Sequence, residues 1–70
     1  MEPHERFARN LKQARLAKHW TQEDLGHWAG LHSTEVGRLE RGNREPRLST
    51  IVRLARALDL TAADLVAGVE

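Results

Sequence analysis

The chain has 70 residues, with eleven Lys/Arg, ten Asp/Glu, a formal net charge of +1 and no cysteine. This length supports one small domain, and the missing cysteines exclude disulfides and cysteine-ligated zinc as stabilising devices. A charge near neutrality gives no general argument for nucleic acid. No apolar run approaches the roughly 20 residues that span a bilayer, and residues 1–6 lack the apolar core of a secretory signal. We therefore expect a cytoplasmic protein with no membrane partner.

The first predicted helix covers about residues 5–18. Phe7, Leu11 and Ala14 recur there at the spacing of one helix face, and Arg15 continues that face with a charge. The segment therefore predicts an amphipathic helix whose buried side ends on an arginine.

The second predicted helix runs from Gln22 to about Ala29. The preceding segment has the pattern of a capping box, with Thr21 as the N-cap and Asp24 three residues later. Gly30 is suited to end this helix in the left-handed conformation. The capping box and Gly30 thus indicate where the helix begins and ends.

The third predicted helix occupies about residues 33–41, after a short linker. Val36, Leu39 and Glu40 share one of its faces. Gly42 supplies the glycine that stops it.

A fourth helix follows the loop of residues 43–47, because Pro46 bars a simple continuation of the third. Its apolar stripe consists of Leu48, Ile51, Leu54, Ala55 and Leu58. Thr61 to Asp64 repeats the capping-box pattern and predicts a short fifth helix with Leu65 and Val66 turned inward. No segment has the alternation of a strand. The sequence therefore predicts an all-α, compact five-helix bundle, one domain over residues 1–70 with its core between about residues 5 and 67.

The segment of about residues 21–42 is the most informative part of the chain. Two short helices joined by a tight turn form a helix-turn-helix unit, here made by the second and third helices. In such a unit the first helix braces against the sugar–phosphate backbone and the second enters the major groove of DNA. Gly26 and Ala29 supply the small residues that are needed where the two helices cross.

Several spaced motifs carry a resemblance to a family. They are Trp20-Thr21-Gln22-Glu23-Asp24-Leu25, Ala29-Gly30-Leu31, Val36-Gly37-Arg38-Leu39-Glu40-Arg41-Gly42, and the series Pro46, Leu48, Ile51, Leu54, Ala55 and Leu58. In this order they resemble the lambda-repressor/Cro-type helix-turn-helix family, also called the XRE family, from about Phe7 to Leu65. The resemblance implies a lambda-repressor-like bundle that binds double-stranded DNA without a cofactor or metal.

The resemblance also implies which residues meet the base edges. They lie at the start of the third helix and are His32, Ser33, Thr34 and Arg38; Glu35, which points to a nearby face, completes the expected set. Arg38 is the main candidate for sequence discrimination, because arginine binds guanine in a bidentate manner; a phosphate contact or plain solvation is the alternative. Glu35 either accepts a hydrogen bond from cytosine, pairs with a neighbouring arginine or repels phosphates.

A second group is expected to meet phosphates. Gln22 lies at a helix start, where free backbone N–H groups and the helix dipole favour an anion; the resemblance implies that it clamps a phosphate, and the alternative is an exposed glutamine. The whole expected set is Thr21, Gln22, Arg41, Asn43, Arg44 and Arg47. Such contacts position the protein and make binding depend on salt.

Arg15 and Glu40 each interrupt an apolar face. The resemblance pairs them as a partly buried structural ion pair between the first and third helices. This role concerns stability, since removing one partner of such a pair typically costs about 3–5 kcal/mol.

Three residues depart from the family pattern. His19 stands in a slot that is commonly glycine, so a left-handed backbone there carries modest strain. His32 stands where a small N-cap is usual, which makes Ser33 a competing cap, with the third helix starting one residue later. Gly37 either allows close approach to DNA or is simply tolerated within the helix.

The two tryptophans are also notable. Trp20 is expected in the core. Trp28 occupies a position that the family usually leaves polar; we expect it to pack back on the bundle, with a subunit contact or the DNA backbone as alternatives. Neither is expected to have the aromatic neighbours of a base-stacking platform.

Other classes of function are less consistent with the sequence. An enzyme is not expected, because cysteine and tyrosine are absent and the four histidines, at positions 4, 19, 27 and 32, form no recognisable metal or triad set. RNA binding is not expected, because the sequence has neither an aromatic platform nor a GXXG loop. The main alternative is an antitoxin or protein-interaction module in which DNA binding is secondary. The shortness of the chain favours that alternative. The set of Gln22, Arg38 and residues 41–47, all expected on one face, opposes it.

The concrete hypothesis is a transcriptional regulator that binds an inverted repeat as a homodimer, with recognition helices about 34 Å apart. Val66 and Val69 are candidates for the dimer contact, together with Leu65 unless the core takes it. An isolated DNA-binding part of a longer protein also fits the sequence. The operator, the sign of regulation and any inducer or protein partner are not indicated.

Overall fold

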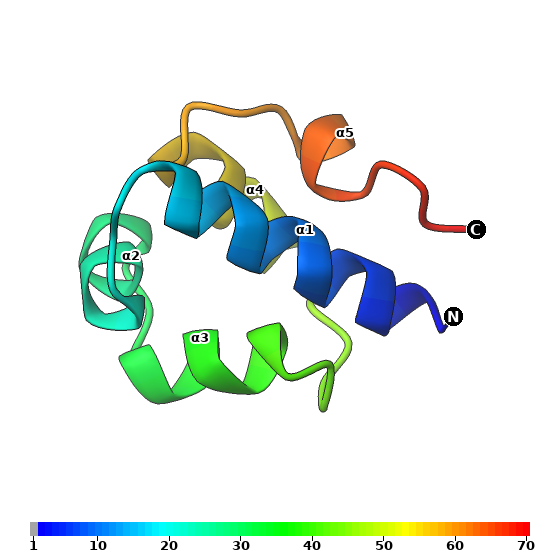
Figure 1. Cartoon of the computed structure of the whole chain (residues 1–70), viewed down its shortest axis with the longest axis horizontal. Coiled ribbons are helices and arrows are strands. Elements are labelled where there is room, and N and C mark those ends of the chain that lie inside the picture. The colour runs from blue at the N-terminus through cyan, green and yellow to red at the C-terminus, as the bar shows by residue number, and fades with distance from the viewer. Residues whose placement is uncertain (1) are drawn as a thin grey trace.

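The computed structural model describes residues 2–70 and contains, within that range, five helices and no strand. The helices are α1 (Pro3–Ala17), α2 (Gln22–Ala29), α3 (Ser33–Glu40), α4 (Leu48–Ala57) and α5 (Ala62–Leu65), as Figure 1 shows. The predicted all-α class is thus confirmed. Met1, the first residue of the predicted domain 1–70, lies outside the described residues. No helix of the described part has the length and apolar character that crossing a membrane requires.

α1 begins at Pro3, about two residues earlier than predicted. Proline is favoured in the first turn of a helix, because its missing N–H has no partner there and its φ is already helical. Beyond the end of the helix, His19 adopts a left-handed φ of 59°. Position 19 therefore adopts the left-handed conformation expected there, although its residue is a histidine.

α2 and α5 both start at their predicted capping boxes. The backbone N–H of Asp24 donates to Thr21 Oγ1 at 3.0 Å, and the backbone N–H of Thr21 donates to Asp24 Oδ2 at 2.8 Å. Thr61 and Asp64 exchange the same two bonds at 3.1 and 2.9 Å. The hydrogen bonds from the backbone and side chain of Thr61 lower the pKa of Asp64 below its ordinary value of 3.8.

α3 begins at Ser33 and is capped by the residue before it. The Nδ1 atom of His32 accepts a hydrogen bond from the backbone N–H of Thr34 at 3.0 Å. Ser33 is therefore not the cap, and the alternative start one residue later is wrong. The histidine replaces the usual hydroxyl because its ring nitrogen is also a hydrogen-bond acceptor.

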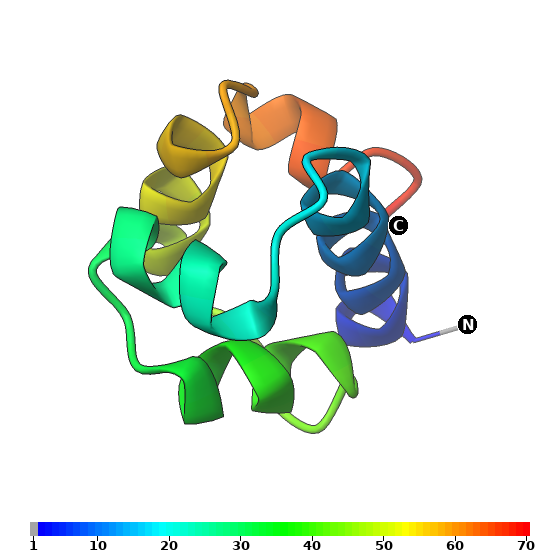
Figure 2. The same ribbon diagram turned by 60° about the vertical axis from the view of Figure 1, so that its left-hand side comes forward.

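Every helix contributes to a single core. The buried members are Phe7, Leu11, Leu25, Ala29, Val36, Leu39, Leu54, Ala55, Leu58 and Leu65. α3 packs against α1 and α2, while α4 packs against α2 and α5. Figure 2 shows α3 along one edge of the resulting bundle. The inner side of α3 is thus fixed by the core, and its outer side is left to solvent.

Candidate nucleic-acid interface

The outer side of α3 forms a continuous exposed face. Thr34 and Arg38 are exposed and four residues apart, and Arg41 follows directly after the helix at a spacing of three. These spacings place all three side chains on one side of the helix. Val36 and Leu39, on the other side, are at most 1% exposed. A partner can therefore approach this face along the whole helix without disturbing the core.

The crossing of α2 and α3 depends on Gly26. A Cβ atom at this position would stand 2.6 Å from the carbonyl oxygen of Leu31. The backbone N–H of Leu31 also donates to the carbonyl oxygen of Gly26 at 2.8 Å, and Gly30 turns the chain with a φ of 72°. The small residue expected at the crossing is required because backbone lies directly against it.

An ion pair joins α3 to α1. Arg15 Nε donates to Glu40 Oε2 at 2.7 Å, and Arg15 Nη2 donates to Glu40 Oε1 at 2.9 Å. The two side chains are only 9% and 3% exposed. Arg15 Nη1 donates in addition to the carbonyl oxygen of Trp20 at 2.7 Å. The hydrogen bonds with Glu40 raise the pKa of Arg15 above its ordinary value, although burial acts in the opposite direction. The two residues that the resemblance pairs are thus joined in a bidentate manner.

The same carboxylate also orients Gln22. Its Nε2 atom donates to Glu40 Oε1 at 3.2 Å. Gly37 leaves room for this arrangement, since a Cβ atom there would stand 3.3 Å from Gln22 Oε1 and 3.2 Å from Arg41 Nη1. The glycine within α3 therefore lets two of the expected phosphate-binding side chains lie close to the helix backbone.

A groove lies between α3 and the segment that leads into α4. Its charged and imidazole side chains are His32, Glu35, Arg38, Arg44, Glu45, Arg47 and Arg53. The fold thus brings three of the expected base-contacting residues together with Arg44 and Arg47, two of the expected phosphate-contacting residues.

A second groove lies on the other side of α3, next to the start of α1. It is lined by Glu5, Ala8, Arg9, Glu40, Arg41, Gly42 and Asn43. Arg41 and Asn43, both expected to meet phosphates, therefore line a different groove from Arg44 and Arg47. Thr21 lines neither groove, and its hydroxyl oxygen serves the capping box of α2.

The two grooves concentrate positive charge. They contain six of the eleven Lys/Arg, whereas their carboxylates other than the paired Glu40 are Glu5, Glu35 and Glu45. The ion pairs found within residues 2–70 are Arg15–Glu40 and Lys18–Asp59. Glu35 is thus not paired with an arginine here, which was one of the three roles expected for it. With Glu40 neutralised by Arg15, the other residues of the grooves carry a charge of +3 in a chain whose total is +1.

Arg9 and Arg53 belong to these grooves but were not predicted. Arg9 comes from α1 and Arg53 from α4, both outside the helix-turn-helix segment. Each is simply a solvent-facing arginine on an amphipathic helix, and this signal is shared by arginines elsewhere in the chain. Only the packing of α1 and α4 around α3 singles them out.

The tryptophans differ from expectation. Trp28 is 64% exposed, and its indole faces that of Trp20 with ring centroids 6.3 Å apart and planes at 14°. His27 lies edge-on to Trp28 at 5.1 Å. The prediction that neither tryptophan has an aromatic neighbour is therefore wrong. Trp20 is only partly buried against the core, so it forms the edge of the core rather than its interior.

A family model described as helix-turn-helix matches residues 11–65. This chain belongs to the helix-turn-helix family. The match contains the complete helix-turn-helix unit of α2 and α3 and extends to the last residue of α5. As a member of this family, the protein is a DNA-binding regulator of transcription.

Relatives and solved structures agree with this assignment. Control protein C.SmaI of Serratia marcescens is 36% identical over 66 residues, which cover 94% of this chain and 79% of that protein. The uncharacterized HTH-type transcriptional regulator y4dL of Sinorhizobium fredii is 39% identical over 56 residues, which cover 80% of this chain. The matched part is 29% of the length of y4dL, so this helix-turn-helix chain corresponds to a portion of that longer protein.

Two crystal structures share the fold. The restriction-modification controller protein C.AhdI from Aeromonas hydrophila has a TM-score of 0.86 at 39% identity, covering 89% of this chain and 94% of that one. The hypothetical transcription factor NHTF from Neisseria has a TM-score of 0.89 at 34% identity, covering 93% of this chain and 75% of that one. The predicted lambda-repressor-like helical bundle is therefore confirmed.

Proposed function

We propose that this chain is a sequence-specific regulator that places α3 in the major groove of double-stranded DNA as one half of a homodimer. The observation that carries this proposal is the exposed face of α3 with an arginine-lined groove on each side. A major groove about 12 Å wide admits one helix. The arginines on both flanks of that helix then meet the phosphates that border the groove.

Base recognition rests on the first two turns of α3. Arg38 binds a guanine through both of its terminal nitrogens, and Thr34 and Ser33 offer hydroxyl groups. Glu35, which has no ion-pair partner among the described residues, accepts a hydrogen bond from cytosine. His32 contributes only through Nε2, because Nδ1 is used to cap α3.

Phosphate contacts divide between the two sides of α3. Arg44 and Arg47 serve one side, with Arg53 as an addition to the predicted set. Arg41 and Asn43 serve the other side, with Arg9 as an addition. Gln22 and Thr21 meet a phosphate at the start of α2. Gln22 has one amide hydrogen on Nε2 left for that contact once the other is donated to Glu40.

The homodimer is proposed because a single α3 contacts too few bases for high specificity. Leu65 is 1% exposed and is therefore not available for a subunit contact. Val66 and Val69 line a shallow apolar depression with Ile51, and Leu48 is 74% exposed. This surface provides the subunit contact in the proposal.

The test is selection from a random duplex library with the wild type, Arg38→Ala and Arg56→Ala. We expect an enriched inverted repeat that Arg38→Ala blurs at one position of each half-site, at a cost of about 1–3 kcal/mol for the correct base. Arg56 is exposed but lines neither groove beside α3, so Arg56→Ala should retain the motif.

A phosphate contact has a different signature. Arg44→Ala should weaken binding to all sequences alike and reduce the slope of log affinity against log salt by about 1. Salt-sensitive binding with no enriched motif, unchanged by Arg38→Ala, would refute specific recognition by α3 and favour the protein-interaction alternative.

A further inference from the structure

Trp28 is the most conspicuous apolar group that DNA binding does not use. It is 64% exposed and lies on the surface of α2. A tryptophan is costly to leave in water and is enriched in protein interfaces, where it often supplies much of the binding energy. We therefore expect Trp28 to be covered by a binding partner.

Trp28 lies on the flank of α2 that faces away from α3. Two residues along a helix differ by about 200° in direction, and Gly26, two residues earlier, is the one packed against the turn into α3. A ligand on Trp28 therefore approaches from a different side than DNA on α3. The two surfaces share only Arg53, which lines a groove on each side, so both can be occupied at once if Arg53 serves one of them.

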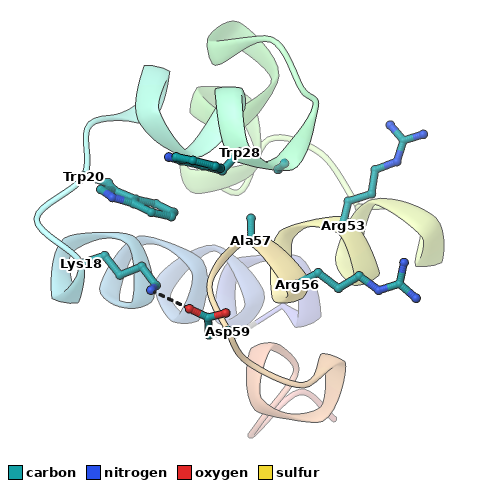
Figure 3. Close-up of a pocket in the computed structure, with 8 residues that line it drawn as sticks. Lys18, Trp20, Trp28, Arg53, Arg56, Ala57 and Asp59 are labelled. Carbon is teal, nitrogen blue, oxygen red and sulfur yellow. Dashed lines mark hydrogen bonds and ion pairs between the residues drawn. The ribbon is translucent and has the colours of Figure 1, made fainter.

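A groove extends from Trp28 toward the end of α4. It is lined by Lys18, Trp20, Ala29, Ala57 and Asp59 in addition to Trp28, and by two arginines of α4, and its volume is about 530 Å³. Figure 3 shows the two indoles on one wall and Ala57 on the wall opposite. The middle of the groove is thus apolar and wide enough to accept a large side chain.

Cations stand at both ends of this groove. Lys18 lies at one end, with its Nζ 5.2 Å from the Trp20 ring centroid. Arg53 and Arg56 extend from α4 at the other end, with their guanidinium groups turned to solvent (Figure 3). The one carboxylate, Asp59, is bound to Lys18 at 3.1 Å. Because this pair is exposed, a competing carboxylate can displace it at little cost.

We propose that this Trp20–Trp28 groove binds an acidic segment of another protein, with one aromatic or large aliphatic side chain against the indoles and carboxylates on both sides of it. The apolar middle accepts that side chain, and the cations at the two ends pair with the flanking carboxylates. The partner is thus defined by a pattern in which acidic residues bracket a large apolar residue.

The charges favour this occupant over a second copy of the chain. A two-fold contact brings the same surface of each subunit together, so it would gather Lys18, Arg53 and Arg56 of both copies in one interface. The indoles argue against nucleic acid, because they already face each other and leave less ring surface for stacked bases.

The experiment is a selection of short random peptides displayed on phage against the immobilised protein, followed by titration of the enriched peptides by tryptophan fluorescence. We expect acidic peptides with a central aromatic or large aliphatic residue. Trp28→Ala should weaken their binding roughly tenfold or more, and Arg56→Ala should weaken it as well. Arg38→Ala should leave it unchanged, whereas the same variant impairs DNA recognition, so the two proposals fail separately.

Three outcomes would overturn the inference. The first is that the selection enriches no acidic peptides, or that the Trp28→Ala and Arg56→Ala variants bind the enriched peptides as tightly as the wild type does. The second is that sedimentation shows a dimer that Trp28→Ala dissociates, which assigns the groove to a second copy. The third is that single-stranded oligothymidine binds in a Trp28-dependent way, which assigns it to nucleic acid. Because Trp28 is largely exposed, Trp28→Ala should fold, and Arg56→Ala tests the groove independently of that residue.

Discussion

Replacement of Glu40 by glutamine keeps the size of the side chain but removes its charge. The Arg15 guanidinium, only 9% exposed, would then face a neutral amide in place of the two carboxylate oxygens that it now contacts at 2.7 and 2.9 Å. Breaking a buried pair in this way costs about 3–5 kcal/mol. Domains carry roughly 0.05–0.15 kcal/mol of stability per residue, which is about 3.5–10.5 kcal/mol for 70 residues, so the loss is about a third of the total or more.

An exposed ion pair in the same protein provides the matched control. Asp59 accepts from Lys18 Nζ at 3.1 Å, and its side chain is 83% exposed. Asp59→Asn makes the same change from acid to amide, and asparagine tolerates the left-handed φ of 58° at this position. Here we expect a loss of less than about 1 kcal/mol.

Urea unfolding followed by far-ultraviolet circular dichroism measures both free energies of unfolding. If Glu40→Gln lowers the free energy of unfolding no more than Asp59→Asn does, the argument that burial makes the Arg15–Glu40 pair important for stability is refuted. The double variant Arg15→Met with Glu40→Leu should be more stable than either single variant, because it leaves no charge buried without a partner.

Three further predictions concern the turns and caps. Gly26→Ala should destabilise the protein by more than about 1 kcal/mol and abolish DNA binding, because its Cβ would stand 2.6 Å from the Leu31 carbonyl oxygen. A variant that unfolds and binds DNA as the wild type does would refute this prediction. His19→Gly should raise the free energy of unfolding by about 0.5–1 kcal/mol, since it relieves a φ of 59°; no gain in urea midpoint would contradict this. The lowered pKa of Asp64 means that the unfolded chain binds more protons near and below its ordinary pKa of 3.8. The stability due to the cap of α5 is therefore present above that pH and lost as the pH falls through the lowered pKa. Asp64→Asn should make acid unfolding less steep in that range, and an unchanged acid titration would argue against the cap.

Local chemistry explains why much of the fold was predictable. α2 was bounded on both sides, by the capping box at Thr21 and by Gly30, and its observed limits agree with the prediction. The start of α3 was harder to predict because an imidazole is an uncommon cap, so His32 and Ser33 competed for the role. Asp59 was not singled out as a left-handed residue, since a helix can also end without one.

Contacts between distant segments account for what the sequence did not reveal. Trp20 and Trp28 are eight residues apart, and they meet only because the corner between α1 and α2 brings the first ring alongside the second helix. Gln22 and Glu40 likewise come together only after α2 and α3 have packed. No periodicity within one helix carries such information. Arg9 and Arg53 were missed for the same reason.

The division of α3 into a buried and an exposed side has an evolutionary consequence. Val36 and Leu39 hold the helix in the bundle, whereas Thr34 and Arg38 make no contribution to the core. Substitutions at the exposed positions can change the preferred DNA sequence while the free energy of folding stays nearly constant. A duplicated copy of this chain can therefore acquire a new target through one or two codon changes without first acquiring a more stable scaffold.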